Sequence, residues 1–506
     1  MKRFWICFTA IALLLSGCYP PKEEIAGTKI DLSDNKITVD GQEITNDHTQ
    51  AVYSAKDIVF YLADQGFTYG EGEKEDEHQQ SEADAHTVIH ITKPGRYVLS
   101  GKLSLGQIAV DLGDEAETDP NAVVTLILND VDITCTVAPA IIFYNVYECC
   151  SSEEETAAKD VDTSKAGANV IIADGTKNNI TGSYVAKIYK SYELNEDGTE
   201  ITDSKKLHKY DGAFYSKKTL NITGGTKGNG ILNIKAENEG LDSELHLTIN
   251  GGIINITSGN DGINTNEDNV SVTTINGGTL NILCDGSTGE GDGIDSNGWL
   301  VINGGSVFAQ ACATSGDAGI DSDKGIYING GSVVASGNML DHIAGGDQTY
   351  AVFQFAGRQN GGSTYSLKNS AGKTVGQYAP ANAFSYLIVA GDALTPGEYT
   401  FWQGENQLSG SQGNPMPGGM PQGGRPEMPG GEQNGQGNPP EDMTPPEKPD
   451  GEPPQGGRPD MPNGMTPPGG GGGMMGGNMM PGGEASTTFT IVKGGNQFSR
   501  VGLATQ

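Results

Sequence analysis

The sequence predicts an all-β fold, a parallel β-helix whose coils each supply short strands to stacked sheets. Glycine is abundant (75 residues), aromatic residues are few (7%), and runs with helical spacing are hard to find. The tripeptide Asn-Gly-Gly recurs at Asn250, Asn276, Asn303 and Asn329, at intervals of 26, 27 and 26 residues. A period of this length with glycine-closed strands is typical of a β-solenoid rather than a propeller.

Alternation within the repeat indicates which side chains face the core. Apolar residues alternate before and after each tripeptide, so both sets can point inward and stack on their equivalents in adjacent coils. The set before it is Leu247, Ile249, Thr273, Ile275, Leu300, Ile302, Ile326 and Ile328. The set after it is Ile254, Ile256, Leu280, Ile282, Val307, Ala309, Val333 and Ala335. By the same alternation Cys284 faces the core and Cys312 faces outward, which predicts that these cysteines are not bonded to each other. The asparagines of the tripeptides are expected to pair with neighbouring backbone.

The first residues have the layout of a secretory signal. Lys2 and Arg3 precede an apolar run over 4–15 that is too short to span a bilayer. The next tetrapeptide, Leu-Ser-Gly-Cys, resembles a bacterial lipobox and implies acylation of Cys18, which gives stable membrane anchoring. An ordinary cleaved signal is the alternative. We therefore expect a signal peptide over 1–17, a lipidated tether over 18–30, and an extracytoplasmic lipoprotein at the cell surface.

Strand-like segments predict one long β domain with a cap at each end. The β-helix and its N-terminal β cap are expected over 31–346, a small C-terminal β cap over 347–408, and a final strand within 485–506. Residues 409–484 form a Gly/Pro/Met-rich tract that cannot bury enough apolar surface to fold. We expect this tract to be a disordered loop inserted between two strands of the C-terminal cap.

Charge and cysteine content restrict the partners. The formal net charge of -33 disfavours nucleic acid, because neutralising phosphates needs clustered lysine and arginine. Cations or cation-bridged anions fit better, although the charge could serve only solubility. The five cysteines beyond Cys18 have no Cys-x-x-Cys spacing, which argues against a disulfide framework and a zinc site. A bridge from Cys135 to Cys149 or Cys150 is left open, and a monomer is expected.

Acids and amides recur at one place in the repeat. In 238–244, 260–266, 291–297 and 317–323, Gly precedes an inward Leu or Ile, so the next residue should project to solvent. This outward column is Asp242, Asn264, Asp295 and Asp321, followed two residues on by Glu244, Asn266, Asn297 and Asp323. The turns before the column carry Asp261, Asp292 and Asp317.

Stacked carboxylates need compensation. Adjacent coils lie about 4.8 Å apart, where two carboxylates repel by roughly 1 kcal/mol in water and by more where water is excluded. Oxygen ligands without His or Cys select Ca²⁺ over zinc. The predicted calcium ligands are Asp242, Asp261, Asp292, Asp295, Asp317, Asp321 and Asp323. A solvated acidic face without an ion is the alternative.

At these residues the chain resembles bacterial exported carbohydrate-binding proteins, which form right-handed parallel β-helices similar to family 9 pectate lyases. The resemblance covers roughly 86–346 and rests on the Asp-Gly-Ile turns, the Thr-Ile-Asn-Gly-Gly strands, and upstream segments such as GRYVLSGKL and YDGAFYSKKTLNIT. It implies calcium in the coils and binding of plant-type polysaccharide, including acidic pectic chains. Phe214 and Asn264 replace the column acid in the first and third coils, and Ala318 displaces the turn acid, so some family sites are expected to be missing.

A pectic ligand fits an acidic face, because Ca²⁺ can bridge protein and uronate carboxylates. Trp299 and Tyr327 are expected to point outward and bind carbohydrate, with Trp299 stacking on a sugar ring unless a loop covers it. We therefore predict a non-catalytic, calcium-dependent carbohydrate-binding protein. A calcium-assisted uronide lyase is the alternative, with Lys324 or the pair Lys217/Lys218 as base. A structural adhesin or spacer is the second alternative.

Overall fold

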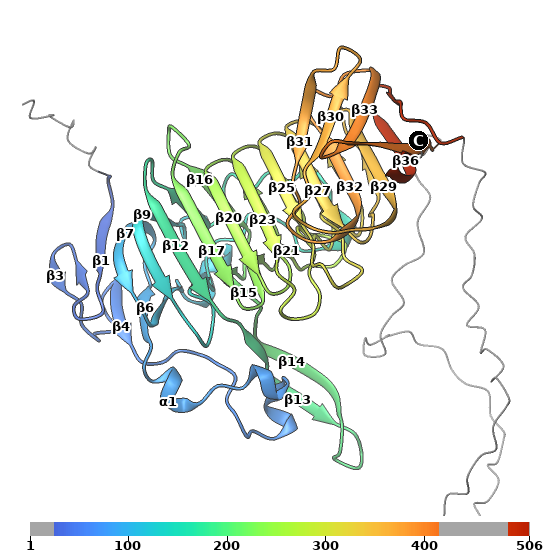
Figure 1. Cartoon of the computed structure of the whole chain (residues 1–506). Helices are drawn as coiled ribbons and strands as arrows, with labels where there is room; N and C mark the ends of the chain where they lie inside the picture. The colour runs from blue at the N-terminus through green and yellow to red at the C-terminus, as the bar shows by residue number, and fades with distance from the viewer. Residues whose placement is uncertain (1–24, 414–483, 505–506) are drawn as a thin grey trace, which may run out of the picture.

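The computed structural model describes residues 25–413 and 484–504. The predicted signal peptide, the lipidation at Cys18, and all but the edges of the predicted 409–484 insertion lie outside these residues. The described chain is all-β, as predicted, and its strands join a large mixed sheet, a seven-stranded sheet and a three-stranded sheet (Figure 1). The helical segments in this part of the chain are short. They are η1 (Phe67–Tyr69), η2 (Lys74–Asp76), α1 (Gln80–Ala83), η3 (Asp114–Thr118) and η4 (Glu154–Thr156).

A first series of strands in the large sheet pairs in parallel. Equivalent residues of successive repeats are in register, so that Leu247 pairs with Leu220 on one side and Thr273 on the other. The series is β11 (Ala168–Ile172), β16 (Leu220–Gly224), β19 (His246–Ile249), β22 (Val272–Ile275), β24 (Trp299–Ile302), β26 (Gly325–Ile328) and β28 (Ile343–Gly345).

A second parallel series lies beside the first in the same sheet (Figure 1). It is β12 (Lys177–Gly182), β17 (Ile231–Ala236), β20 (Ile253–Ser258), β23 (Thr279–Cys284), β25 (Ser306–Gln310) and β27 (Ser332–Gly337). The long strand β9 (Val124–Thr134) pairs with both β11 and β12, and β7 (Gly95–Leu103) pairs with β9.

A third parallel series forms the seven-stranded sheet, with an antiparallel strand, β4 (Val52–Ala55), at its edge. Its parallel members are β6 (Thr87–Ile91), β8 (Gly106–Val110), β10 (Ile141–Phe143), β15 (Gly212–Ser216), β18 (Glu239–Ser243) and β21 (Ile263–Thr265). From β15 to β23 the chain visits the third, first and second series in turn.

The predicted inward residues do form the core. Every member of both alternating sets is buried, with at most 2% of its surface exposed. The prediction for Cys284 is confirmed, but the prediction that Cys312 faces outward is wrong, because Cys312 is buried beyond the end of β25, where strand alternation no longer applies. All five cysteines of the described chain are free thiols, so Cys284 and Cys312 are unbonded as predicted and Cys135 makes no bridge.

The Asn-Gly-Gly turns are held differently from the prediction. The asparagine side chains bond to one another rather than to backbone: Asn276, Asn303 and Asn329 each donate an Nδ2 hydrogen bond of 2.8 Å to the preceding asparagine. The second glycine of the tripeptide cannot be replaced by another residue type without strain. Gly278 has φ +93°, and a Cβ on it would lie 2.7 Å from the carbonyl oxygen of Gly252.

The N-terminal part covers the first coils with short strands. β1 (Thr28–Leu32) pairs in parallel with β7 and begins inside the predicted tether, and the small strands β2 (Thr38–Val39) and β3 (Gln42–Glu43) extend it. A long hairpin, β13 (Val185–Leu194) and β14 (Ile201–Tyr210), projects from the body and pairs with β5 (Gly70–Glu71) (Figure 1). The end of β14 returns the chain to β15.

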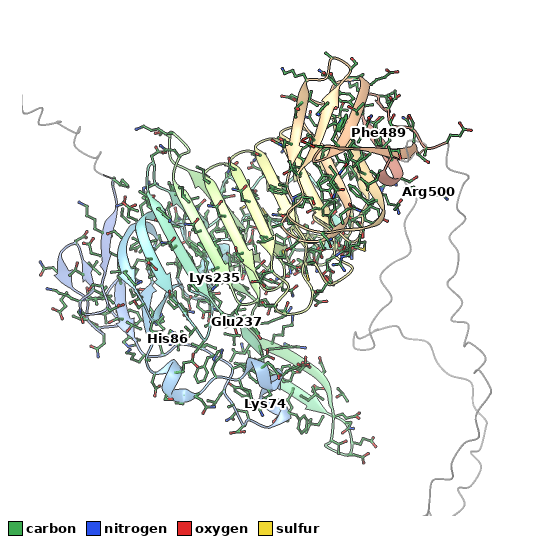
Figure 2. All side chains as sticks on the ribbon, in the orientation of Figure 1. Lys74, His86, Lys235, Glu237, Phe489 and Arg500 are labelled. Atoms are coloured by element: carbon green, nitrogen blue, oxygen red, sulfur yellow. The ribbon has the colours of Figure 1, made fainter. Side chains whose placement is uncertain are left out.

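The C-terminal strands form a unit that is antiparallel apart from the parallel pair β29–β36, with its own aromatic core, which includes Phe353, Phe401 and the labelled Phe489 (Figure 2). The strands are β29 (Tyr350–Gln359), β30 (Tyr365–Asn369), β31 (Thr374–Tyr378), β32 (Phe384–Ala390), β33 (Gly397–Gln403), β34 (Asn406–Gln412), β35 (Phe489–Ile491) and β36 (Gly495–Leu503). β34 continues past Ser409, the expected start of the insertion. Gly410 and Ser486 bond to each other through their backbones, so the described ends of the insertion are neighbours.

In the described ranges no helix has the length and apolar character needed to cross a membrane.

Candidate functional site

The acidic column is assembled by backbone register in the third series. Asp242 of β18 pairs with Asn264 of β21. The amide of Asp295 donates to the carbonyl of Ile263 (2.8 Å), and the amide of Asp321 donates to that of Ile294 (2.7 Å). The four column residues therefore follow one another along the stack in the predicted order.

The first coil differs from the prediction. Phe214 pairs with Leu241 and is a fully buried inward residue, so the prediction that it replaces the column acid is wrong. Tyr215 is the residue in register with Asp242. Its hydroxyl donates to Glu244 Oε1 at 2.9 Å. The column thus begins with a phenol that binds a carboxylate.

The first end of the column is buried, which corrects the prediction that Asp242 and Asn264 project into solvent. Asp242 is 0% exposed and Asn264 is 8% exposed. The chain around the β14–β15 junction covers them: Lys209 Nζ lies 2.8 Å from Asp211 Oδ2, and its positive charge acts on Asp242 and on Glu239. A single lysine therefore faces a cluster of three carboxylates.

Several oxygens at this end lack a hydrogen bond. Asn264 donates to Glu239 Oε1 (2.9 Å) and Asn266 donates to Asp242 Oδ1 (2.7 Å). Glu239 Oε2, Asp242 Oδ2 and Asn264 Oδ1 are buried and accept nothing from the described residues. Burial, with repulsion from neighbouring carboxylates, raises the pKa of Glu239 and of Asp242 well above the usual range. Buried oxygens of this kind are costly unless a positive group binds them.

The second end of the column brings three predicted ligands together. One carboxylate oxygen from each of Asp292, Asp295 and Asp321 lies within 4.8 Å of the other two. Burial is the main cause of a raised pKa for Asp292 and Asp321, and the carboxylates around them add to it. The pKa of Asp321 rises to about 8.

The remaining predicted acids have other environments. Asp261 Oδ1 accepts the amide of Asp292 (2.7 Å), and Asp317 Oδ2 accepts the amide of Gly291 (2.6 Å), so both brace the turn between coils. Burial, followed by the charge of Asp295, raises the pKa of Asp261 to about 8. Asp323 is exposed and is not among the three clustered carboxylates.

The sequence reasoning missed Glu239, Asp211 and Asp341. Glu239 and Asp211 each precede a glycine at the turn position that Asp261 and Asp292 occupy in later coils, so the same alignment could have found them. Asp341 interacts with Asp321 and accepts the amide of Ser322 (3.0 Å), but it lies in a non-repeating segment that no alignment would have marked.

A cavity of about 380 Å³ adjoins the first end of the column. Tyr144, Tyr210 and Tyr215 line it with a group of lysines and with Glu244. Those lysines are Lys206, Lys209, Lys217 and Lys218. Tyrosine rings offer flat apolar surface and lysines offer donors and positive charge, which together suit a polar, ring-shaped ligand.

The two predicted sugar-binding aromatics lie beside the loop over 144–167, which joins β10 to β11. Trp299 and Tyr327 are partly buried, and each has a lysine ammonium over its ring: Lys324 at 5.1 Å from the Trp299 centroid and Lys159 at 5.2 Å from that of Tyr327. The Lys324 ammonium in turn lies 3.7 Å from a carboxylate oxygen of Glu154, which belongs to the same loop as Lys159. One face of each ring is therefore engaged within the protein.

Fold and site together define an extended all-β protein with an acidic column and a cavity lined by tyrosine and lysine, the construction of a ligand-binding protein. A family model described as a carbohydrate-binding domain-containing protein matches residues 85–351, more than half of the chain. The chain belongs to this family of carbohydrate-binding domain-containing proteins.

The chain is also similar to one further protein and to one solved structure. A carbohydrate-binding domain-containing protein of Acetivibrio thermocellus is 30% identical over 169 residues, which make up 33% of this chain and 44% of that protein. The chain thus spans less than half the length of this relative. A solved structure, described as a polysaccharide lyase-like protein from C. thermocellum in a gadolinium derivative, is 20% identical with a TM-score of 0.28, over 63% of this chain and 99% of its own.

Proposed function

We propose that this protein is a non-catalytic, calcium-dependent carbohydrate-binding protein whose ligand is an acidic polysaccharide of the pectic type. In this proposal the three strand series are the faces of a right-handed parallel β-helix, and each coil supplies one strand to each face. The protein is a monomer held at the cell surface by lipid on Cys18. The observation that carries the proposal is the cluster of carboxylate oxygens from Asp292, Asp295 and Asp321, together with the buried oxygens of Glu239 and Asp242 that accept no hydrogen bond from the described residues.

The donor set fits calcium. Asp292, Asp295 and Asp321 offer three clustered carboxylate oxygens, and Asp242, Glu239 and Asn264 offer further oxygens at the other end. Oxygen ligands in flexible arrangement are what Ca²⁺ prefers, and a bound divalent charge removes the repulsion that now raises these pKa values. Calcium would also supply a bridge to uronate carboxylates at exposed edges of the column.

The cavity beside the first end suits the sugar. Lys206 and Lys217 line it without an ion pair among the described residues, and their charge would attract uronate groups. Tyr144, which is partly buried, gives apolar ring surface for a pyranose, while Tyr210 and Tyr215 are buried behind it and support its ring. We therefore place sugar recognition here rather than at Trp299 and Tyr327.

The lysines argue for binding rather than for lyase chemistry. A base that abstracts a proton needs a lowered pKa, but the Asp211 carboxylate holds the pKa of Lys209 above its usual range despite the opposing effect of burial. Lys218 is paired with Glu117 at 2.8 Å, and Lys324 is engaged by Glu154 and Trp299.

Retention of the full-length protein on immobilised polygalacturonate tests the proposal. We expect retention with calcium, release by EDTA, and little retention on a neutral glucan. Release of unsaturated uronide would indicate the lyase instead. Equal passage through both columns with and without calcium would contradict the proposal and favour a structural spacer. Metal analysis after dialysis provides an independent measurement, since calcium should be bound even if the protein recognises a polysaccharide other than polygalacturonate.

A further inference from the structure

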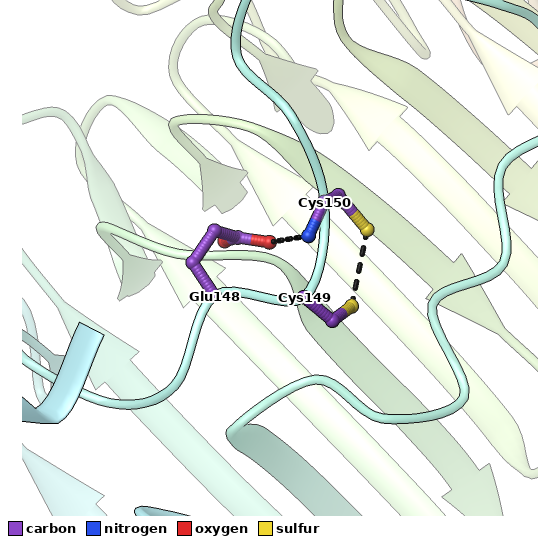
Figure 3. A group of neighbouring side chains, drawn as sticks. All are labelled: Glu148, Cys149 and Cys150. Atoms are coloured by element: carbon purple, nitrogen blue, oxygen red, sulfur yellow. Dashed lines mark hydrogen bonds between the residues drawn. The ribbon is translucent and has the colours of Figure 1, made fainter. Parts of the chain in front are cut away.

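Cys149 and Cys150 lie in the loop over 144–167, which joins β10 to β11 and packs against strands of the first series. The sulfur atoms of Cys149 and Cys150 are 3.1 Å apart, and both residues are partly buried (Figure 3). Each sulfur also lies 3.8 Å from the carbonyl oxygen of Asp162. Cys150 lines the 380 Å³ cavity, which gives a small reagent a route to the pair.

Glu148 braces the pair rather than extending it into a metal site. One carboxylate oxygen of Glu148 accepts the amide of Cys150 (2.9 Å) and the hydroxyl of Thr219 (2.8 Å), and the other accepts the amide of Thr219 (2.8 Å). Thr219 is fully buried. The carboxylate is thus committed to the protein, and it fixes the backbone of Cys150 (Figure 3).

The loop is fixed on its other side as well. Thr163 donates to Asn221 Oδ1 at 2.8 Å, and Asn221 donates back to the carbonyl oxygen of Thr163 at 2.7 Å. The two sulfurs are therefore held close by a backbone that is anchored before and after them.

The two thiols are chemically unequal. The hydrogen bond between the two sulfurs lowers the pKa of Cys149 and raises that of Cys150. Burial instead raises the pKa of Cys135 to about 12, and Cys284 and Cys312 are buried in the core. Access therefore distinguishes the Cys149–Cys150 pair from the three buried cysteines, and within the pair Cys149 has the lowered pKa.

We propose that Cys149 and Cys150 are a dithiol that closes into a disulfide between neighbouring residues by exchange with a low-molecular-weight disulfide. The Cys149 thiolate attacks one sulfur of the reagent, forming a mixed disulfide and releasing one reagent thiolate. Cys150 then loses its proton and attacks the Cys149 sulfur, which forms the intrachain bond and releases the second thiolate. The protein loses two hydrogens, and the reagent is reduced to two thiols.

The closed form is readily reopened. The sulfurs have to approach from 3.1 Å to a bond length of about 2.05 Å. Adjacent Cα atoms are about 3.8 Å apart, below the usual disulfide range of roughly 4.4–6.8 Å, and constrained disulfides are the more easily reduced ones. The pair is thus a reversible redox modification site.

Peptide mass mapping of the full chain tests this site. The reduced protein is incubated with oxidised glutathione, alkylated while folded, and digested. We expect the peptide with Cys149 and Cys150 to have lost two hydrogens, to carry no alkyl group, and to regain both thiols after dithiothreitol. Alkylation of both cysteines after the oxidant, or a disulfide joining two chains, would overturn the proposal.

Two single substitutions separate the steps. Cys150→Ser should accumulate a stable glutathione adduct on Cys149, because the resolving thiol is missing. Cys149→Ser should react about tenfold more slowly, because burial and the Glu148 charge still raise the pKa of the remaining Cys150 thiol. Equal rates in the two variants would contradict the assigned order. Thermal unfolding of both variants shows that the comparison is made on folded protein.

Discussion

The two ends of the acidic column differ in how their negative charge is offset. At the Asp242 end, Lys209 lies among Asp211, Glu239 and Asp242 and supplies a positive charge from the protein itself. At the Asp292 end, three carboxylates converge, and the charges that act on Asp292 and Asp321 are those of other carboxylates. In the proposed function, the first end is stabilised from within the chain and the second by an external cation. Four experiments test this contrast.

The largest effect is expected from pH on the calcium-free protein. The pKa of Asp261 and of Asp321 is raised to about 8 in the folded state, mainly by burial, while the unfolded chain titrates near the ordinary value of about 4. The folded state therefore holds more protons between these values, and its stability falls as pH rises from 4 to 8. One group shifted by about four pKa units corresponds to at most about 6 kcal/mol, since one unit is about 1.4 kcal/mol, and we expect a loss of several kcal/mol over this range.

Urea unfolding at several pH values, with and without calcium, measures this loss. Calcium should flatten the dependence, and Asp321→Asn should flatten it without calcium. A calcium-free stability that rises toward pH 8 would show that the carboxylates are not repelling one another.

Asp292→Asn is expected to lower calcium affinity by about a hundredfold, because ligand charge sets affinity at such sites. The same change should raise the melting temperature of the calcium-free protein, because it removes one of three repelling groups. Isothermal titration and thermal unfolding measure the two effects. Asp323→Asn is the matched control, since Asp323 is exposed and outside the cluster. Equal losses in both variants would contradict the assignment.

Lys209→Met should destabilise the protein by about 1 kcal/mol at pH 7, a discounted value because the lysine side chain is 41% exposed. The loss should shrink at pH 5, where Glu239 and Asp242, whose pKa values are raised by burial, are protonated. Lys235→Met, at an exposed lysine of β17, is the control and should have little effect. If both lysines behaved alike in urea unfolding, the Asp242 end would not depend on its own cation.

The smallest effect is expected for Trp299→Leu on polysaccharide retention. Lys324 covers one face of Trp299, so retention should change by less than about twofold, whereas Tyr144→Ala in the cavity should weaken it by about tenfold or more. Affinity electrophoresis in gels containing polygalacturonate compares the two. The reverse order would move recognition to the Asp292 end.

The repeat explains why much of this arrangement could be predicted. Alternation with a period of two forces Leu247 and Ile249 inward together, and identical spacing stacks their equivalents. The same logic ordered Asp242, Asn264, Asp295 and Asp321 along one column. The turn acid Glu239 was equally readable from its alignment with Asp261.

Contacts made by non-repeating segments could not be predicted in this way. Asp242 is buried because Lys209 arrives from the end of the hairpin, which no period describes. Trp299 and Tyr327 are covered by lysines from distant or irregular chain, and the cavity joins residues from Glu117 to Glu267. Tertiary neighbours, rather than local pattern, decide solvent access at these positions.

The asparagine ladder at the Asn-Gly-Gly turns has a consequence for how such a chain can grow. Asn276 and Asn303 each donate one side-chain hydrogen bond to the preceding asparagine of the ladder and accept one from the next. The interior asparagines therefore have equivalent hydrogen-bond partners. Duplicating or deleting one full turn would restore the same bonding and the same glycine geometry at the junction. The length of the chain can thus change in steps of about 26 residues. A shorter insertion or deletion would break the register, so that the apolar side chains beyond it would no longer stack on their equivalents.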